Sequence, residues 1–197
     1  MDEEQWLTGS DSDQLLAYLL QNSKASERKR QLFTVASYRR LWHLFTNELS
    51  RRAVEVSEGN ADGLASREDV EAAWDAAEAA TAGGPDPHMT IYLALRQQDE
   101  LEAGCHLLRC IFGNPFRPAS LAPAWLSWHD ATVVRLAQAA YEERQMPAGT
   151  LDNGRLAVLA DGLEEAGCTS EDVLGHLRGP GPHVRGCWAV DRCLGKS

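Results

Sequence analysis

Apolar side chains recur at steps of three and four residues through most of this chain, and this spacing limits the fold more than any other feature. One such face follows Ser26 and contains Leu32, Val35, Tyr38, Trp42, Phe45 and Leu49. A period near 3.6 places such side chains on one side of an α-helix. No segment shows the clear alternation of apolar and polar residues that is typical of a β-strand. The sequence therefore predicts an all-α fold.

Residues whose side chains accept hydrogen bonds from free helix amides stand before several of the periodic segments. Ser26 and Ser170 are such residues, and Ser66 with Asp69 resembles a capping box. Asp130 is expected to cap a helix after residue 130, and a final helix is expected over 184–194. Together these segments predict a compact bundle or irregular array of about eight or nine helices.

A chain of 197 residues is expected to form a single helical domain, 1–197. The Gly-Gly-Pro-Asp-Pro run near its centre is a candidate hinge at 82–88, between helical halves 1–82 and 88–197. A second irregular stretch, 113–129, is rich in proline and tryptophan. Long connections inside a compact domain are often packed by their own side chains. We therefore predict one long ordered connection, fixed by Phe116, Trp125 and Trp128.

Charge is distributed unevenly along the chain. The segment 24–52 has a net charge of +6, whereas the whole chain carries −10, so the remainder carries −16. Such a segment can bind an acidic partner protein or a phosphate backbone. The candidate binding residues are Arg28, Lys29, Arg30, Arg39, Arg40, Arg51 and Arg52. The simpler interpretation is that these side chains pair with the protein's own acidic helices.

The five cysteines are odd in number and irregularly spaced, which favours reduced, buried thiols over a disulfide framework. His183 and Cys187 have a usable metal-ligand spacing, but the close Cys pairs of structural zinc sites are missing. We therefore expect no metal and no cofactor. The residues that a metal could recruit are Cys168, His176, His183, Cys187 and Cys193. A cysteine nucleophile, Cys187 or Cys110, is a further alternative.

The C-terminal segment 178–197, RGPGPHVRGCWAVDRCLGKS, combines reactive side chains with an apolar helix face. Asp191 lies on that face, where a carboxylate needs a partner such as Arg178, Arg117, Arg39 or Arg40. We expect this helix to close the fold against residues 111–118, IFGNPFRP. The predicted structural cluster comprises Phe116, Arg117, Trp125, Trp128, His183, Arg185, Cys187, Trp188 and Asp191.

Five blocks of the chain resemble an expanded family of bacterial paralogues, which are helical proteins without an assigned activity. The blocks are LFTVASYRRLWHLFTNELSRRAVEVSE, LLRCIFGNPFRP, APAWLSWHDATVVRLAQAAYEER, LADGLEEAGC and RGPGPHVRGCWAVDRCLGK. The resemblance covers nearly the whole chain. Members of that family often have two cysteines where this chain has Ser37 and Tyr38, which weakens any metal or redox role for those positions.

No apolar run approaches the about 20 residues needed to cross a bilayer, and the first residues are acidic rather than basic. We therefore expect a cytoplasmic protein with no membrane partner. The leading functional prediction is a non-enzymatic helical module, regulatory or adaptor in role, that binds another protein. Nucleic-acid or nucleotide binding through 24–52 is the alternative. A cysteine-dependent enzyme or a zinc-binding protein is third.

Overall fold

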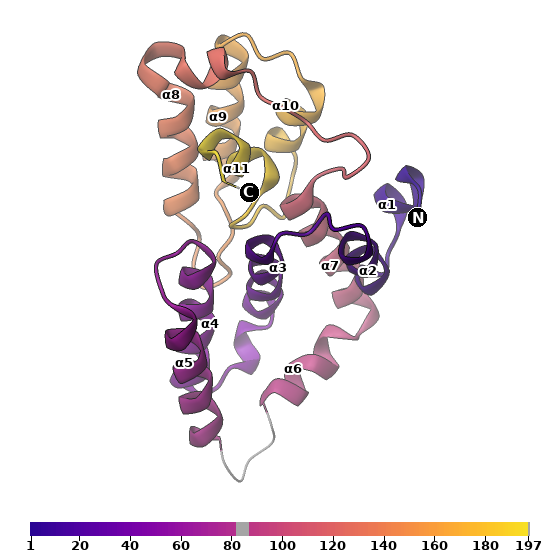
Figure 1. The fold of residues 1–197 in the computed structure, drawn as a ribbon, viewed down its shortest axis with the longest axis vertical. Coiled ribbons are helices and arrows are strands. Elements are labelled where there is room, and N and C mark those ends of the chain that lie inside the picture. The colour runs from indigo at the N-terminus through magenta and orange to yellow at the C-terminus, as the bar shows by residue number, and fades with distance from the viewer. Residues whose placement is uncertain (82–86, 197) are drawn as a thin grey trace. The chain divides into compact units, whose positions relative to one another are not determined.

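The all-α prediction is confirmed by the computed structural model, which describes residues 1–81 and 87–196 (Figure 1). Within these residues there are eleven α-helices, one 3-10 helix and no strand. The number of helices exceeds the predicted eight or nine, partly because Glu3–Thr8 forms a short helix, α1, that the periodicity did not reveal. Asp2 and Gln5 make a reciprocal capping box that begins this helix.

The chain divides into two compact units. The inner unit is continuous and comprises residues 10–105, whereas the terminal unit combines residues 1–9 with residues 106–197. These boundaries do not coincide with the candidate hinge at 82–88. Residues 82–86 of that hinge lie outside the described residues, so the hinge stays a prediction.

The inner unit is built from short amphipathic helices around a small aromatic core. Its elements are α2 (Ser12–Gln21), α3 (Glu27–Arg40), the 3-10 helix η1 (Trp42–Leu44), α4 (Glu48–Ala61), α5 (Arg67–Ala80), α6 (Pro87–Leu95) and the first part of α7 (Gln98–Phe112). Helix α4 packs against both α3 and α5. The core of the inner unit contains Val35, Leu41, Phe45, Val54 and Ile91.

The long apolar face predicted after Ser26 is interrupted in the structure. Ser26 caps α3 as predicted, but α3 ends at Arg40, and Asn47 caps a new helix by accepting a hydrogen bond from the Leu49 amide. The turn between the two helices lets Phe45 reach the core and leaves Leu49 exposed. The expectation that one helix face runs from Leu32 to Leu49 was therefore wrong in its second half.

The terminal unit contains the second part of α7 and the helices that follow it. These are α8 (Pro123–Glu142), α9 (Asn153–Glu165), α10 (Glu171–Arg178) and α11 (Trp188–Leu194), together with α1. Helix α9 packs between α8 and α10, and α11 packs against α8 and α10 (Figure 1). The buried Trp6 indole donates a hydrogen bond to the carbonyl of Gly113, and this bond fixes α1 to the end of α7.

The proline- and tryptophan-rich connection is shorter than predicted. Pro123 begins α8, where its fixed φ suits the first helical position. Trp125 therefore belongs to the first part of α8, and Trp128 is the first residue of a non-helical kink that interrupts this helix. Asp130 was predicted to cap a helix, but it lies with His129 and Ala131 in a left-handed kink inside α8. The irregular connection is reduced to residues 113–122.

Among the described residues, none of the helices is both long and apolar enough to cross a membrane.

Candidate metal centre

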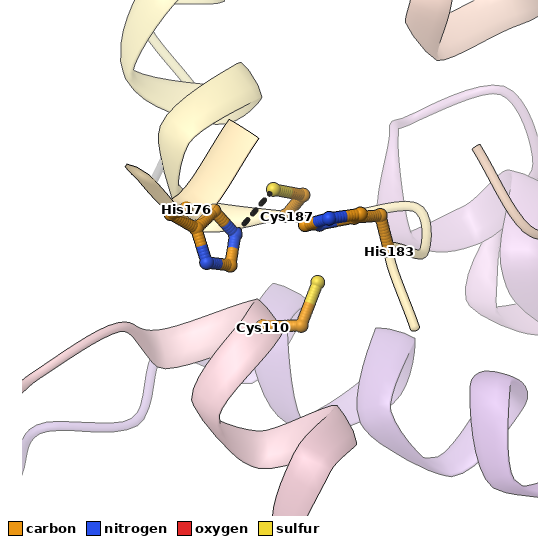
Figure 2. Close-up of side chains that lie close together, drawn as sticks. All are labelled: Cys110, His176, His183 and Cys187. Atoms are coloured by element: carbon orange, nitrogen blue, oxygen red, sulfur yellow. Dashed lines mark hydrogen bonds between the residues drawn. The ribbon is translucent and has the colours of Figure 1, made fainter. Parts of the chain in front are cut away.

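Four side chains of the terminal unit converge on one point in its interior. They are Cys110, His176, His183 and Cys187, and we call them the Cys2His2 group. Figure 2 shows the two sulfur atoms facing the centre, with one imidazole on either side. The four donor atoms all lie within 4.8 Å of one another. Cys110, His183 and Cys187 are buried, and His176 is partly exposed.

Two members of the group are held by helices. Cys110 lies on α7 beside the buried Leu107, Leu108 and Ile111, so its side chain points into the core of the terminal unit. His176 lies on α10, which Ser170 caps as predicted by accepting a hydrogen bond from the Val173 amide. The helical backbones fix the directions of these two side chains.

The other two members come from the segment between α10 and α11. The carbonyl of His183 accepts a hydrogen bond from the Leu151 amide, and Val184 forms an isolated β-bridge with Thr150. These backbone contacts keep His183 and Val184 out of the last helix. The prediction of a helix from residue 184 was therefore wrong at its start, because α11 begins at Trp188 with Cys187 as its N-cap.

A backbone carbonyl fixes the orientation of the His183 ring. His183 Nε2 lies 3.2 Å from the carbonyl oxygen of Gly179, and since that oxygen can only accept, Nε2 carries the proton. In the neutral ring, Nδ1 then has the lone pair. Nδ1 is buried and makes no hydrogen bond of ordinary geometry, and His183 also interacts with the Cys187 sulfur. A histidine whose second nitrogen donates to a carbonyl is the usual arrangement of a metal-binding imidazole.

The surroundings of Cys187 favour its thiolate form. Burial alone would raise the pKa of this thiol, but its interactions with Cys110, His176 and His183 hold the pKa well below its usual range. The nearest contact joins His176 Nε2 and Cys187 Sγ over 3.2 Å. Burial alone would likewise lower the pKa of His183, but the Cys187 sulfur and the Gly179 carbonyl raise it. The thiolate is the form of cysteine that binds metals.

The donor set fits a tetrahedral zinc ion. Zn–S bonds of about 2.3 Å and Zn–N bonds of about 2.0–2.1 Å place neighbouring donors about 3.3–3.8 Å apart. The observed spread of up to 4.8 Å is therefore about 1 Å wider than a zinc ion requires, which small side-chain rotations can close. Two thiolates also balance the charge of a divalent ion.

The close approach of Cys187 and His176 is also what a cysteine nucleophile requires. Cys187 is fully buried, however, and a substrate carbonyl needs direct access to the sulfur. The geometry therefore favours metal binding over nucleophilic catalysis.

Three of the five metal candidates proposed from the sequence belong to the group, namely His176, His183 and Cys187. Cys168 and Cys193 do not. Burial, followed by the nearby Cys187 and Cys168, raises the pKa of Cys193 to about 12, which keeps it a neutral thiol. Sequence reasoning missed Cys110 as a ligand. Its signal was its position directly before IFGNPFRP, the block expected to face the last helix.

The packing expected between the last helix and IFGNPFRP occurs at Gly113. A Cβ atom at this position would lie 3.0 Å from the Trp188 ring, and Gly113 has a φ of +69°. Only glycine combines that conformation with so close an approach. The Trp188 ring lies in turn 5.1 Å from the His176 ring, measured between centroids.

The other members of the predicted structural cluster are spread over the terminal unit. Arg117 pairs with Glu3, and the amide of Phe116 donates to Asn114. A Cβ on Gly167 would lie 3.7 Å from the Trp125 indole nitrogen, and Trp128 packs on the neighbouring His129. The guanidinium of Arg185 stacks over the buried Tyr141 ring at 4.8 Å. These contacts do not by themselves join the residues into one cluster, so the predicted cluster stays a prediction.

Asp191 is buried, as the apolar face predicted. The four arginines considered as its partner each pair with a different carboxylate: Arg178 with Asp161 and Glu164, Arg117 with Glu3, Arg39 with Glu58, and Arg40 with Glu100. The pairs proposed for Asp191 therefore stay predictions.

The basic segment is engaged largely with the protein's own acids. Five of its seven candidate binding residues form ion pairs within the inner unit: Arg28–Asp62, Arg39–Glu58, Arg40–Glu100, Arg51–Glu48 and Arg52–Glu55. Lys29 and Arg30 lie in the first turn of α3. These pairs favour the simpler interpretation of the charge pattern. Nucleic-acid binding through this segment stays a prediction.

Comparison of the chain with protein-family models, curated proteins and solved structures gave no match. The resemblance to a family of bacterial paralogues therefore stays a prediction, and the donor geometry is the strongest indication of function.

Proposed function

We propose that this protein binds one zinc ion through Cys110, His176, His183 and Cys187, and that the ion has a structural role in the terminal unit. The observation that carries the proposal is the convergence of four donors of the types that zinc prefers. The buried Nδ1 of His183, which makes no hydrogen bond of ordinary geometry, supports it, because a buried polar atom without such a bond destabilises the fold.

A structural role follows from the number and origin of the donors. Four protein ligands fill a tetrahedral shell, whereas catalytic zinc ions keep one position for water or substrate. The ligands come from α7, from α10 and from the segment before α11. An ion at this point would cross-link three parts of the terminal unit that are separate in the sequence.

Metal analysis tests this proposal directly. Protein purified under reducing conditions is expected to contain about one zinc per chain, and a strong chelator should remove it. Free zinc at a hundredfold excess over Kd would stabilise the fold by about 2.7 kcal/mol, so chelation should lower Tm. Cobalt should replace zinc and give the visible absorption of a tetrahedral thiolate complex. Absence of stoichiometric zinc and of any cobalt spectrum would refute the proposal.

Gly181 allows a test of whether the backbone next to His183 positions this proposed zinc ligand. It has a φ of +86°, and a Cβ there would lie 2.7 Å from the His183 backbone nitrogen. Gly181→Ala is therefore expected to displace His183 and to weaken zinc binding by about 10- to 100-fold. This is the usual effect of changing a residue that orients a metal ligand. A chelator competition titration measures the change.

Gly175 provides the matched control for that variant. It lies next to His176 on α10, and a Cβ there would meet nothing within 4 Å. Gly175→Ala should keep the wild-type zinc affinity. Equal effects of the two substitutions would mean that the turn at Gly181 does not position a ligand.

The functions predicted from the sequence stay predictions beside this proposal. A closed zinc site is compatible with a non-enzymatic module that binds another protein, because such a site leaves no metal position for a substrate.

A further inference from the structure

We propose that Cys110 and Cys187 form a peroxide-sensitive thiol pair, whose oxidation to a disulfide releases the zinc ion. This inference rests on the proposed zinc site and adds its regulation. The inference is drawn from the two thiols of the Cys2His2 group, whose sulfur atoms lie within 4.8 Å of each other. All five cysteines are free thiols in the structure.

The separation of the two sulfur atoms, at most 4.8 Å, is compatible with disulfide formation. Forming a disulfide requires the two sulfur atoms to approach to about 2.05 Å, with Cα atoms no more than about 7 Å apart. Cys110 is held within α7, but Cys187 is the N-cap of α11 and so precedes the regular helix. The Cys187 backbone is held by hydrogen bonds to Val184 and Asp191, so we expect rotation of the two cysteine side chains to bring the sulfur atoms together.

The other cysteines are poorer partners for Cys187. Cys193 follows it by six positions on α11, which corresponds to about 9 Å along a helix axis and exceeds the disulfide limit. Cys168 is not a member of the Cys2His2 group. Cys105 belongs to the inner unit.

His176 is the one member of the Cys2His2 group that is not buried, so we expect an oxidant as small as hydrogen peroxide to enter beside its ring. Its Nε2 lies 3.2 Å from Cys187 Sγ, so a peroxide that passes the imidazole meets Cys187 first. The Cys187 thiolate attacks one peroxide oxygen; an S–O bond forms, the O–O bond breaks and hydroxide leaves. The Cys110 thiolate then attacks the sulfenic sulfur; an S–S bond forms, the S–O bond breaks and a second hydroxide leaves.

In total, two thiolates and one hydrogen peroxide molecule are converted to one disulfide and two hydroxide ions. The hydroxide ions take protons from the solvent. The two sulfurs lose two electrons and the peroxide gains them. Zinc keeps its oxidation state. A disulfide sulfur is not a thiolate ligand, so the ion loses two of its four donors and leaves.

The sequence makes the test sharp because trypsin separates the relevant cysteines. Cleavage after Arg109, Arg185 and Arg192 puts Cys110, Cys187 and Cys193 in different peptides. Zinc is first measured in the reduced wild-type protein, and hydrogen peroxide is then added stepwise. A chromogenic chelator reports released zinc, and non-reducing peptide mapping identifies the disulfide.

The expected result is one zinc released per disulfide, with two thiols lost and a linked peptide pair containing Cys110 and Cys187. Dithiothreitol followed by zinc should restore the starting state. A Cys193→Ser variant should behave as the wild type. Zinc retained after oxidation, or released with another disulfide or with sulfinic acid instead, would overturn the inference while leaving the zinc site intact. Reduced protein without zinc would overturn both proposals.

Discussion

Cys187→Ala is expected to abolish stoichiometric zinc binding and to weaken zinc affinity by more than about 100-fold. Disturbing residues that only support a ligand already weakens metal binding by about 10- to 100-fold, so loss of a direct ligand should cost more. Cys187 Sγ also lies 3.2 Å from His176 Nε2, so removing the thiol breaks one of the contacts between α10 and the start of α11. Chelator competition gives the affinity, and circular dichroism shows whether the helices persist.

Cys193→Ala is the matched control for that substitution. Cys193 is a buried cysteine near the other end of α11, and it lies outside the Cys2His2 group. Its replacement should lower the stability of the packed core and leave zinc affinity unchanged. If both variants lost zinc equally, the loss would reflect disturbed packing of α11 and not a missing ligand.

Glu58→Gln is expected to destabilise the inner unit by about 3 kcal/mol, because breaking a buried ion pair leaves an uncompensated charge. Glu58 Oε2 lies 2.7 Å from a terminal nitrogen of Arg39, and the two side chains are only 5% and 3% exposed. The guanidinium of Arg39 also lies 5.2 Å from the centre of the Trp42 ring. Urea unfolding followed by tryptophan fluorescence and by circular dichroism measures the loss.

Glu55→Gln controls for the loss of a negative charge on the same helix. Glu55 pairs with Arg52 at 3.9 Å, and both side chains are exposed. Exposed pairs contribute about 0.2–1 kcal/mol, so this variant should unfold almost as the wild type does. A similar small change in Glu58→Gln would show that Arg39 finds compensation elsewhere when the carboxylate is removed.

Local signals in the sequence predicted local structure well. The side chains of Ser26, Ser66 and Ser170 accept the amide hydrogen bonds expected of helix caps, and Gly195 ends α11 in the left-handed conformation. Each of these features depends on neighbours within a few residues, which a single sequence displays. The helical class of the fold follows from such features together.

The errors were of two kinds, local signals misread around α8 and a distant backbone partner at Val184. Pro123 was expected to lie in a loop and instead begins α8, and Asp130 lies in a left-handed kink rather than at a helix cap. Val184 was expected to be helical, but its backbone pairs with Thr150. Periodicity and capping preferences contain no information about such partners.

In the candidate site, too, part of the arrangement could be predicted from the sequence and part depends on tertiary packing. The spacing of His183 and Cys187 was visible in the sequence, and so was the expected packing of the last helix against IFGNPFRP. Joining the two observations would have brought Cys110 to the site. The absence of a close cysteine pair argued against zinc only because that rule describes ligands grouped along the chain. Here tertiary packing brings Cys110 to the other three ligands.

The terminal unit is formed from both ends of the chain, and this has a consequence for synthesis on the ribosome. The inner unit is continuous, so residues 10–105 can complete their contacts while the rest of the chain is still being made. Trp6 emerges 107 residues before Gly113, whose carbonyl accepts its indole hydrogen bond. The first nine residues must therefore wait for residues 109–117, which hold their partners, and Cys110 must wait for Cys187. Premature termination would leave the N-terminal helix without its partner and the first zinc ligand without the other three.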